Sequence, residues 1–242
     1  MGEPNVKALE NANRERIRGY LRAAGLESLE GREHDIERAI HDLMATLSAG
    51  PATADARSPY EYPVPMLSED GSCSIVDEMA PVPYDLAAIL GGRTEQTTRR
   101  LRLLGAVAHR ARETTGSEWV GVYQRRMNPA GLPVLVKLAY VGRASRAEFP
   151  LTREFAERSA NSTVGLTGRA TVIEDVARHV EAGGGFYVCD DGIQSEACVP
   201  ILDDARKVIG IVDAEARPTG FFGATRLVIV AALAMVSAPL LP

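Results

Sequence analysis

Six residues between positions 119 and 215 are of the types that line reactive pockets: Trp119, Tyr123, Cys189, Glu196, Asp213 and Glu215. A cysteine supplies a nucleophilic thiolate, and two carboxyl groups held close together keep a proton because their charges repel. Asp213 and Glu215 are separated by one residue, so in a strand both carboxyl groups lie on one face. They interrupt an apolar segment and therefore indicate a functional site, unless the other face of that strand is solvated.

The composition is that of a chain with one sizeable core and a smaller appendage, since 45% of its 242 residues are apolar. The net charge is -5 and the 27 basic residues are scattered, so no nucleic-acid partner is expected. The N-terminus does not resemble a secretory signal. The apolar run 227–238 is shorter than the roughly 20 residues that span a bilayer. We therefore predict a cytoplasmic protein without a membrane partner, in which this run is a buried helix.

The three cysteines, Cys73, Cys189 and Cys198, are too few and too irregularly spaced for a disulfide framework or a zinc ribbon. Reduced thiols are therefore expected, and no metal site is predicted.

The first part of the chain is predicted to be a helical extension. Residues 5–24 have apolar positions at helical spacing, and a second helix is predicted from an N-cap at Asp35 to a stop at Gly50 and Pro51. These two helices could form an antiparallel hairpin. Prolines are frequent in residues 51–68, which indicates an extended connection without regular structure.

The remaining chain reads as helix, two strands, an irregular crossover, two or three strands and a last helix. Apolar periodicity predicts helices at 94–115 and 224–237 and strands at 119–123, 134–141, 197–202 and 208–212. This order indicates an α+β fold, with an antiparallel sheet against flanking helices and a helical extension before it.

Three features between residues 119 and 215 occur together in one order. They are an aromatic pair four residues apart (Trp119, Tyr123), a Cys-Asp pair whose cysteine precedes a Glu by seven residues (Cys189, Asp190, Glu196), and two carboxylates one residue apart (Asp213, Glu215). With them, residues 95–242 resemble the free methionine-(R)-sulfoxide reductases, a catalytic branch of the GAF domains. That family usually has Asp at both carboxylate positions, so Glu215 is one methylene longer.

The resemblance implies a GAF-like fold, related to PAS domains. It does not cover the beginning of the chain, which we divide into a helical extension (1–50) and a Pro-containing linker (51–92) before the GAF-like domain (93–242).

The resemblance also implies chemistry. Cys189 would attack the sulfur of the sulfoxide while Asp213 and Glu215 supply a proton to the departing oxygen. A second thiol would then release Cys189 as a disulfide, and an external thiol reductant such as thioredoxin, rather than a bound cofactor, would restore both thiols.

The ligand implied is free methionine sulfoxide or a similar small amino-acid-like molecule. Trp119 and Tyr123 would pack against its thioether side chain, and Glu196 would bind its ammonium group. A homodimer is the expected assembly.

The resolving cysteine of the family is replaced here by Thr167, between Gly165 and Gly168. Cys198 is the better substitute, because it is two residues after Glu196 and on the same strand face, although a cysteine in an apolar strand is often inert. Its bond to Cys189 would need Cα atoms within roughly 7 Å. Cys73, in the linker, is the other substitute.

A competing hypothesis is a non-catalytic GAF ligand sensor or a dimerisation and signalling module. The helical extension and the missing resolving cysteine suit this reading. The last helix is apolar on nearly all sides between Leu227 and Val236, which would support an interface. No output domain is recognisable in the sequence.

Overall fold

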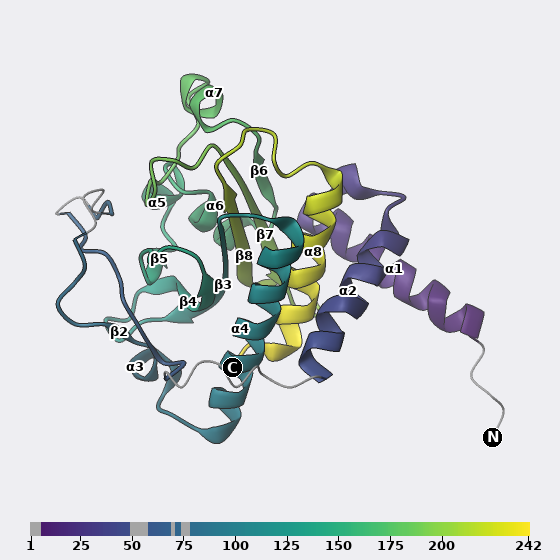
Figure 1. Ribbon diagram of the computed structural model, residues 1–242, viewed down its shortest axis with the longest axis horizontal. Coiled ribbons are helices and arrows are strands. Elements are labelled where there is room, and N and C mark those ends of the chain that lie inside the picture. The colour runs from purple at the N-terminus through teal and green to yellow at the C-terminus, as the bar shows by residue number, and fades with distance from the viewer. Residues whose placement is uncertain (1–5, 49–57, 69–70, 74–77) are drawn as a thin grey trace.

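The computed structural model describes residues 6–48, 58–68, 71–73 and 78–242, and a six-stranded antiparallel sheet lies at the centre of this part (Figure 1). The strand order is β5-β4-β3-β8-β7-β6. The strands are β3 (Trp119–Met127), β4 (Pro133–Val141), β5 (Glu148–Pro150), β6 (Thr171–Ile173), β7 (Ser195–Leu202) and β8 (Val208–Ala216). The predicted α+β class, with helices before an antiparallel sheet, is confirmed.

Side chains alternate across the sheet and divide the core in two. On one face, Val120 and Val122 of β3 belong to a large core shared with α4 (Glu95–Thr115) and α8 (Ala224–Ser237). On the other face, Trp119 and Tyr123 belong to a smaller core rich in aromatic residues. This second face is partly covered by α6 (Ala160–Thr167). The candidate site residues of β3 therefore lie on the face opposite α4 and α8.

The two long helices of the sheet domain occupy the predicted ranges. The Thr94 side chain accepts the backbone N–H of Thr97 and so starts α4, and Gly116 ends it in the left-handed conformation with φ 74°. The helix α8 has the predicted bounds.

The crossover between β4 and β7 is more regular than expected. Besides β5 and β6 it contains α5 (Arg153–Ala156), α6 and α7 (Val176–Glu181). Each of these elements except α6 has fewer than eight residues, which is too short for an apolar repeat to be recognised.

The extension consists of α1 (Val6–Ala24), a 3-10 turn η1 (Glu27–Leu29) and α2 (Glu33–Ser48). The two helices contact each other, as Arg18 of α1 lies 2.8 Å from Glu33 at the start of α2. In Figure 1 they cross at a steep angle, so the expected antiparallel hairpin is not seen. The predicted N-cap at Asp35 is wrong, because α2 already begins at Glu33 and Asp35 lies in its first turn. The predicted stop at Gly50 and Pro51 lies outside the described residues.

The helix α8 is enclosed by its own chain. It packs against α2, α4 and β7, and in Figure 1 it lies between α4 and α2. Arg110 of α4 donates two hydrogen bonds of 2.8 Å to Asp42 of α2, which joins the extension to the sheet domain. The apolar residues around α8 are therefore explained by packing within the chain, not by an interface, and the homodimer stays a prediction. Among the described residues, no helix is both long and apolar enough to cross a membrane.

The described residues between 58 and 86, which we call the strap, connect the extension to the sheet domain. Its strands β1 (Glu61–Tyr62) and β2 (Tyr84–Asp85) pair antiparallel, and α3 (Ala87–Leu90) follows. The expectation of no regular structure is therefore wrong at Glu61–Tyr62. Tyr62 and Leu86 are buried in the large core, whereas the predicted domain boundaries stay predictions.

Candidate active site

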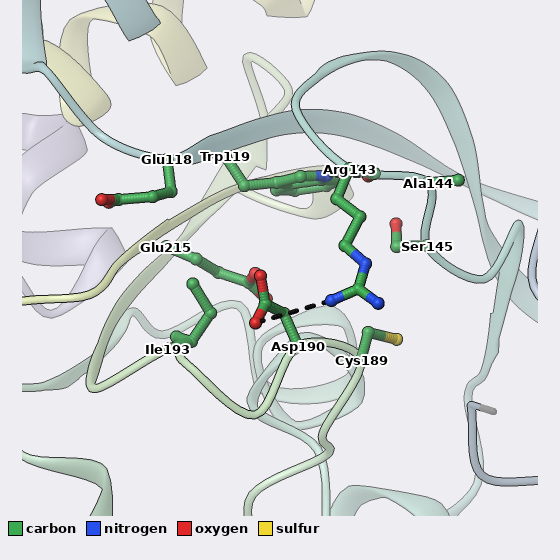
Figure 2. Close-up of a pocket in the computed structure, with 9 residues that line it drawn as sticks. All are labelled: Glu118, Trp119, Arg143, Ala144, Ser145, Cys189, Asp190, Ile193 and Glu215. Carbon is green, nitrogen blue, oxygen red and sulfur yellow. Dashed lines mark hydrogen bonds and ion pairs between the residues drawn. The ribbon is translucent and has the colours of Figure 1, made fainter. Parts of the chain in front are cut away.

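A small cavity lies where the beginning of β3 meets the end of β8 (Figure 2). Its volume is about 30 Å³, enough for one or two water molecules. Two loops enclose it, one after β4 and one before β7. The lining residues are Glu118, Trp119, Arg143, Ala144, Ser145, Cys189, Asp190, Ile193 and Glu215. Three of the six sequence-predicted residues, Trp119, Cys189 and Glu215, thus meet at one cavity.

Of the two aromatic residues, only Trp119 lines the cavity, and Tyr123 packs in the core. Trp119 lines the cavity, its indole N–H donates to the Arg143 carbonyl at 3.0 Å, and its ring stacks on Tyr140. Tyr123 does not line this cavity, is 1% exposed and meets Phe149 edge to face at 5.6 Å. Burial raises the pKa of the Tyr123 phenol well above its usual value, so the ring stays neutral.

Asp190 joins the two loops of the cavity. One of its carboxylate oxygens lies 3.7 Å from the Arg143 guanidinium, as the dashed line in Figure 2 shows, and the other accepts from Arg217 at 3.1 Å. The backbone N–H of Gly192 also donates to Asp190 at 2.9 Å. The ion pair with Arg143 links the segment that carries Cys189 to the loop after β4, and the bond from Arg217 links it to the chain after β8.

The strands β7 and β8 bring the three predicted carboxyl groups together. Glu196 pairs with Glu215 and Cys198 pairs with Asp213 across the two strands. Burial raises the pKa of Asp213 to about 7. Burial first, and then the charge of Asp213, raises the pKa of Glu196 and of Glu215 well above the usual range. Desolvation is therefore a larger cause than the mutual repulsion expected from the sequence.

One proton is shared within this group. A side-chain hydrogen bond joins Glu196 to Asp213, and such a bond needs a protonated acid because a carboxylate only accepts. Asn161 donates to Asp213 at 3.2 Å, which favours the charged form of Asp213. The proton is accordingly assigned to Glu196, and Asp213 is the first of the acids to ionise.

The same group has the donor types of a metal site. Ligand atoms of Glu196, Cys198 and Asp213 lie within 4.8 Å of one another, so these residues are the ones to consider if an ion binds. The shared proton accounts for the proximity of Glu196 and Asp213 without an ion, and the pairing of β7 with β8 places Cys198 opposite Asp213, so we assign no metal to these residues.

The cysteines are not paired as the sequence suggested. Cys189 forms a disulfide with Cys73 of the strap, so the expectation of three reduced thiols is wrong for this structure. Cys198, the substitute favoured from the sequence, is free and fully buried. Burial and the nearby acids raise the pKa of its thiol well above the usual value, which makes it a poor nucleophile.

The GAF domain model matches residues 99–238, more than half of the chain. The chain belongs to the GAF family. No curated protein gives a significant match to it. The six-stranded sheet and its helices agree with this assignment.

Solved structures similar to this GAF protein include reductases and other GAF domains. The type II free methionine-R-sulfoxide reductase of Thermoplasma acidophilum is 20% identical, with a TM-score of 0.52 over 60% of this chain and 94% of that one. The free methionine-R-sulfoxide reductase of Neisseria meningitidis is 23% identical, with a TM-score of 0.48 over 58% and 77%. A putative GAF sensor protein of Burkholderia vietnamiensis is 20% identical, with a TM-score of 0.46 over 57% and 80%. At these identities the likeness describes the fold.

Sequence reasoning missed Lys137, which is fully buried in this GAF domain. Its ammonium nitrogen donates to the Ser145 carbonyl at 2.7 Å and to the Ser145 hydroxyl at 2.9 Å, and it lies 4.1 Å from the centre of the Tyr140 ring. Burial lowers the pKa of Lys137 well below its usual value. Lys137 thus holds the loop that lines the cavity. The sequence did contain a signal for this residue, because a lysine within the otherwise apolar run 134–141 is expected to be buried.

A second hollow, of about 500 Å³, lies between β6, α7 and the start of α8. It is more open than the first, and none of the sequence-predicted site residues lines it. The chemistry-bearing residues of this GAF domain therefore point to the smaller cavity.

Proposed function

We propose that this GAF domain reduces free methionine-(R)-sulfoxide, with Cys189 as the nucleophile. The observation that carries the proposal is that Cys189 lines the same cavity as Trp119 and Glu215. A thiol that enters a disulfide thus lies beside an aromatic wall and a carboxyl group of raised pKa. A thiol, a proton source and a surface for a thioether are what sulfoxide reduction requires.

The first chemical step needs no bound cofactor. The Cys189 thiolate attacks the sulfoxide sulfur and forms a sulfur–sulfur bond, while the sulfoxide oxygen takes up a proton. The oxygen is then transferred to the Cys189 sulfur as this sulfur–sulfur bond and the methionine sulfur–oxygen bond break. Methionine leaves, Cys189 is left as a sulfenic acid, and the two electrons come from the thiol. Glu215 is the proton donor we propose, because it lines the cavity and its pKa is raised. Asp213 lies behind it in the buried group.

The structure changes the role that we propose for Glu196, which the resemblance implied to be binding of the substrate ammonium. Glu196 does not line the cavity in this structure, and its proton is shared with Asp213. A protonated Glu196 offers the substrate ammonium a hydrogen-bond acceptor but no charge. We therefore propose that Glu196 contributes to the site mainly by bonding Asp213, and that Trp119 supplies the wall for the thioether.

The cavity must open before the substrate binds. A volume of about 30 Å³ holds water but not an amino acid. The disulfide and the Arg143–Asp190 pair both hold the wall that contains Cys189. We propose that this structure corresponds to the closed, oxidised form and that reduction by a thioredoxin-type dithiol, of the kind present in a cytoplasm, restores the open form.

The test is a single-turnover assay with the full chain, reduced and then freed of reductant. Methionine formed from L-methionine-(R)-sulfoxide is counted, with the (S)-sulfoxide and the Cys189→Ser variant as controls. The proposal expects near one methionine per chain from the (R) isomer and none from either control. Methionine formation by Cys189→Ser would exclude Cys189 as the nucleophile.

A ligand sensor is the second candidate, favoured by the contact of α2 with α4 and α8. These helices cover the sheet face opposite the cavity, so a shift of the sheet on ligand binding would reach the extension. Saturable binding of the sulfoxide to the reduced protein without any methionine formed would support this candidate instead.

A further inference from the structure

We propose that Cys73 is the resolving cysteine of this site, delivered by the strap from outside the GAF-matched residues. This inference rests on the proposed function, since it names the thiol that completes the same reaction. The disulfide joins Cys73 to Cys189 across 116 residues of sequence, with the two Cα atoms 5.2 Å apart. Such proximity is within the usual range for a disulfide. The thiol absent from position 167 is thus replaced by one from a different part of the chain.

Contacts other than the disulfide hold the strap beside the cavity. The carbonyl of Gly71, two residues before Cys73, accepts hydrogen bonds from Arg146 at 3.0 Å and from the Tyr187 hydroxyl. Arg146 is itself buried, and its guanidinium lies 4.7 Å from the centre of the Phe155 ring. Cys73 also forms an antiparallel bridge with Leu67. These bonds do not depend on sulfur, so the strap stays beside the sheet domain when Cys73 is reduced.

The two strands of the strap are anchored to the sheet domain as well. The Tyr62 hydroxyl donates to the Lys137 carbonyl at 2.7 Å, and the Tyr84 hydroxyl donates to the Glu148 carboxylate at 2.5 Å. Anchors on both sides of Cys73 reduce the volume that its thiol can explore and raise its effective concentration at Cys189. The strap is therefore built to present a thiol, whether or not the bond is formed.

Cys198 does not have these properties. It is fully buried in β7, opposite Asp213, and is not bonded to Cys189. Its surroundings disfavour a thiolate, as burial and the nearby carboxyl groups raise its pKa. Cys198 therefore serves as a small apolar residue that packs in the aromatic core.

The resolving step balances without further reactants. The sulfur of Cys73 attacks the sulfenic sulfur of Cys189, and the sulfur–oxygen bond of that group breaks. The hydroxyl group leaves as water with one further proton, which comes from the Cys73 thiol, or from solvent if Cys73 attacks as a thiolate. Two thiols are thereby oxidised for each sulfoxide reduced. An external dithiol then reduces the disulfide by exchange.

The experiment measures thiols lost for each methionine formed in a single turnover, using the reduced full chain and L-methionine-(R)-sulfoxide. The wild type and Cys198→Ala should each lose two thiols per methionine. Cys73→Ser should lose one and retain a Cys189 sulfenic acid that dimedone labels. Peptide mapping under non-reducing conditions should find the Cys73–Cys189 disulfide in the first two proteins. Loss of two thiols by Cys73→Ser, with a Cys189–Cys198 disulfide, would overturn the inference.

A second probe separates this inference from the proposed function. If the wild type forms no methionine, the proposed reductase activity fails, and one equivalent of hydrogen peroxide is used to oxidise Cys189 instead. A Cys73–Cys189 disulfide in the wild type, and dimedone labelling of Cys189 in Cys73→Ser, would still support the resolving pair. Persistence of a Cys189 sulfenic acid beside a free Cys73 thiol in the wild type would overturn it. Because mapping of the wild type needs no variant, the test does not depend on the folding of Cys73→Ser.

Discussion

Glu196 of β7 lies directly opposite Glu215 of β8, so two acids occupy one cross-strand pair beside the buried Asp213. Like charges in such a pair destabilise a sheet. The raised pKa of both glutamates means that the pair avoids this cost by keeping protons at neutral pH. A protonated acid next to a cavity is useful for proton transfer and is unfavourable for stability, which is the combination expected of a functional site.

We expect Glu196→Gln to stabilise the protein above neutral pH. The glutamine amide has the shape of a protonated Glu196 and can donate to Asp213 at any pH. The folded protein holds the Glu196 proton above the pH at which the unfolded chain releases it, and a glutamine avoids this cost. The gain in the free energy of unfolding should be at least about 1.4 kcal/mol at about pH 8, the value of one pKa unit. Urea unfolding of the variant and the wild type measures it. A loss of stability at that pH would show that the Glu196 proton is not the link to Asp213.

Asp213 should make the protein less stable as the pH rises from about 4 to about 7. The folded state holds this proton up to a pKa of about 7, whereas the unfolded state releases it near 3.8, so between these values the folded state binds more protons. At about 1.4 kcal/mol per pH unit, the loss from Asp213 is on the order of 3 kcal/mol between about pH 5 and about pH 8.

The variant Asp213→Asn removes this contribution, together with the charge that raises the pKa of Glu196 and of Glu215. Lys137 acts in the opposite direction, because its pKa is lowered and the unfolded state binds the extra proton. The difference between the urea-unfolding curves of the wild type and Asp213→Asn removes that contribution. A difference that does not change between the two pH values would contradict the assignment.

Gly121→Ala should displace the wall of the cavity. A Cβ at Gly121 would lie 2.1 Å from the nearest atom of the Trp119 ring, so the indole must move. Trp119 is the single tryptophan of the chain, and the emission of the variant should therefore shift and its affinity for methionine should fall several-fold. Gly105→Ala in α4 is the matched control, because a Cβ there meets no atom within 4 Å. The control should keep the wild-type emission and gain up to about 1 kcal/mol in stability.

The oxidised protein should bind methionine at least tenfold more weakly than the reduced protein. With the disulfide formed, the cavity of about 30 Å³ leaves no room for an amino acid, and the wall that carries Cys189 cannot move away from the strap. Calorimetric titration of L-methionine into both forms measures the ratio. Cys73→Ser serves as a control that cannot form this bond and should bind methionine under oxidising conditions. Equal affinities of the two wild-type forms would show that the disulfide does not close the site.

The sequence predicted the elements whose patterns are long. The bounds of α8 were predicted correctly and those of α4 to within one residue, because apolar periodicity, Thr94 and Gly116 define them locally. The three-residue strands β5 and β6 were missed, as three residues contain too few alternations to recognise. The apolar surface of α8 was interpreted as a possible interface because nothing local indicates that α2 covers it.

The sequence also predicted only part of the candidate site, namely the features that depend on residues close together in the chain. Period-two geometry along one strand predicted that Asp213 and Glu215 share a face, and the motif spacing led to the GAF family, since both depend on residues close in sequence. The pairing of Cys189 depends on how the strap packs against the sheet domain, over a separation of 116 residues. Spacing in the sequence therefore favoured Cys198, and only the tertiary structure brought Cys73 to the site. The sequence by itself determined the fold family and the residue types of the pocket, whereas burial and long-range packing decided which acids keep protons and which thiols meet.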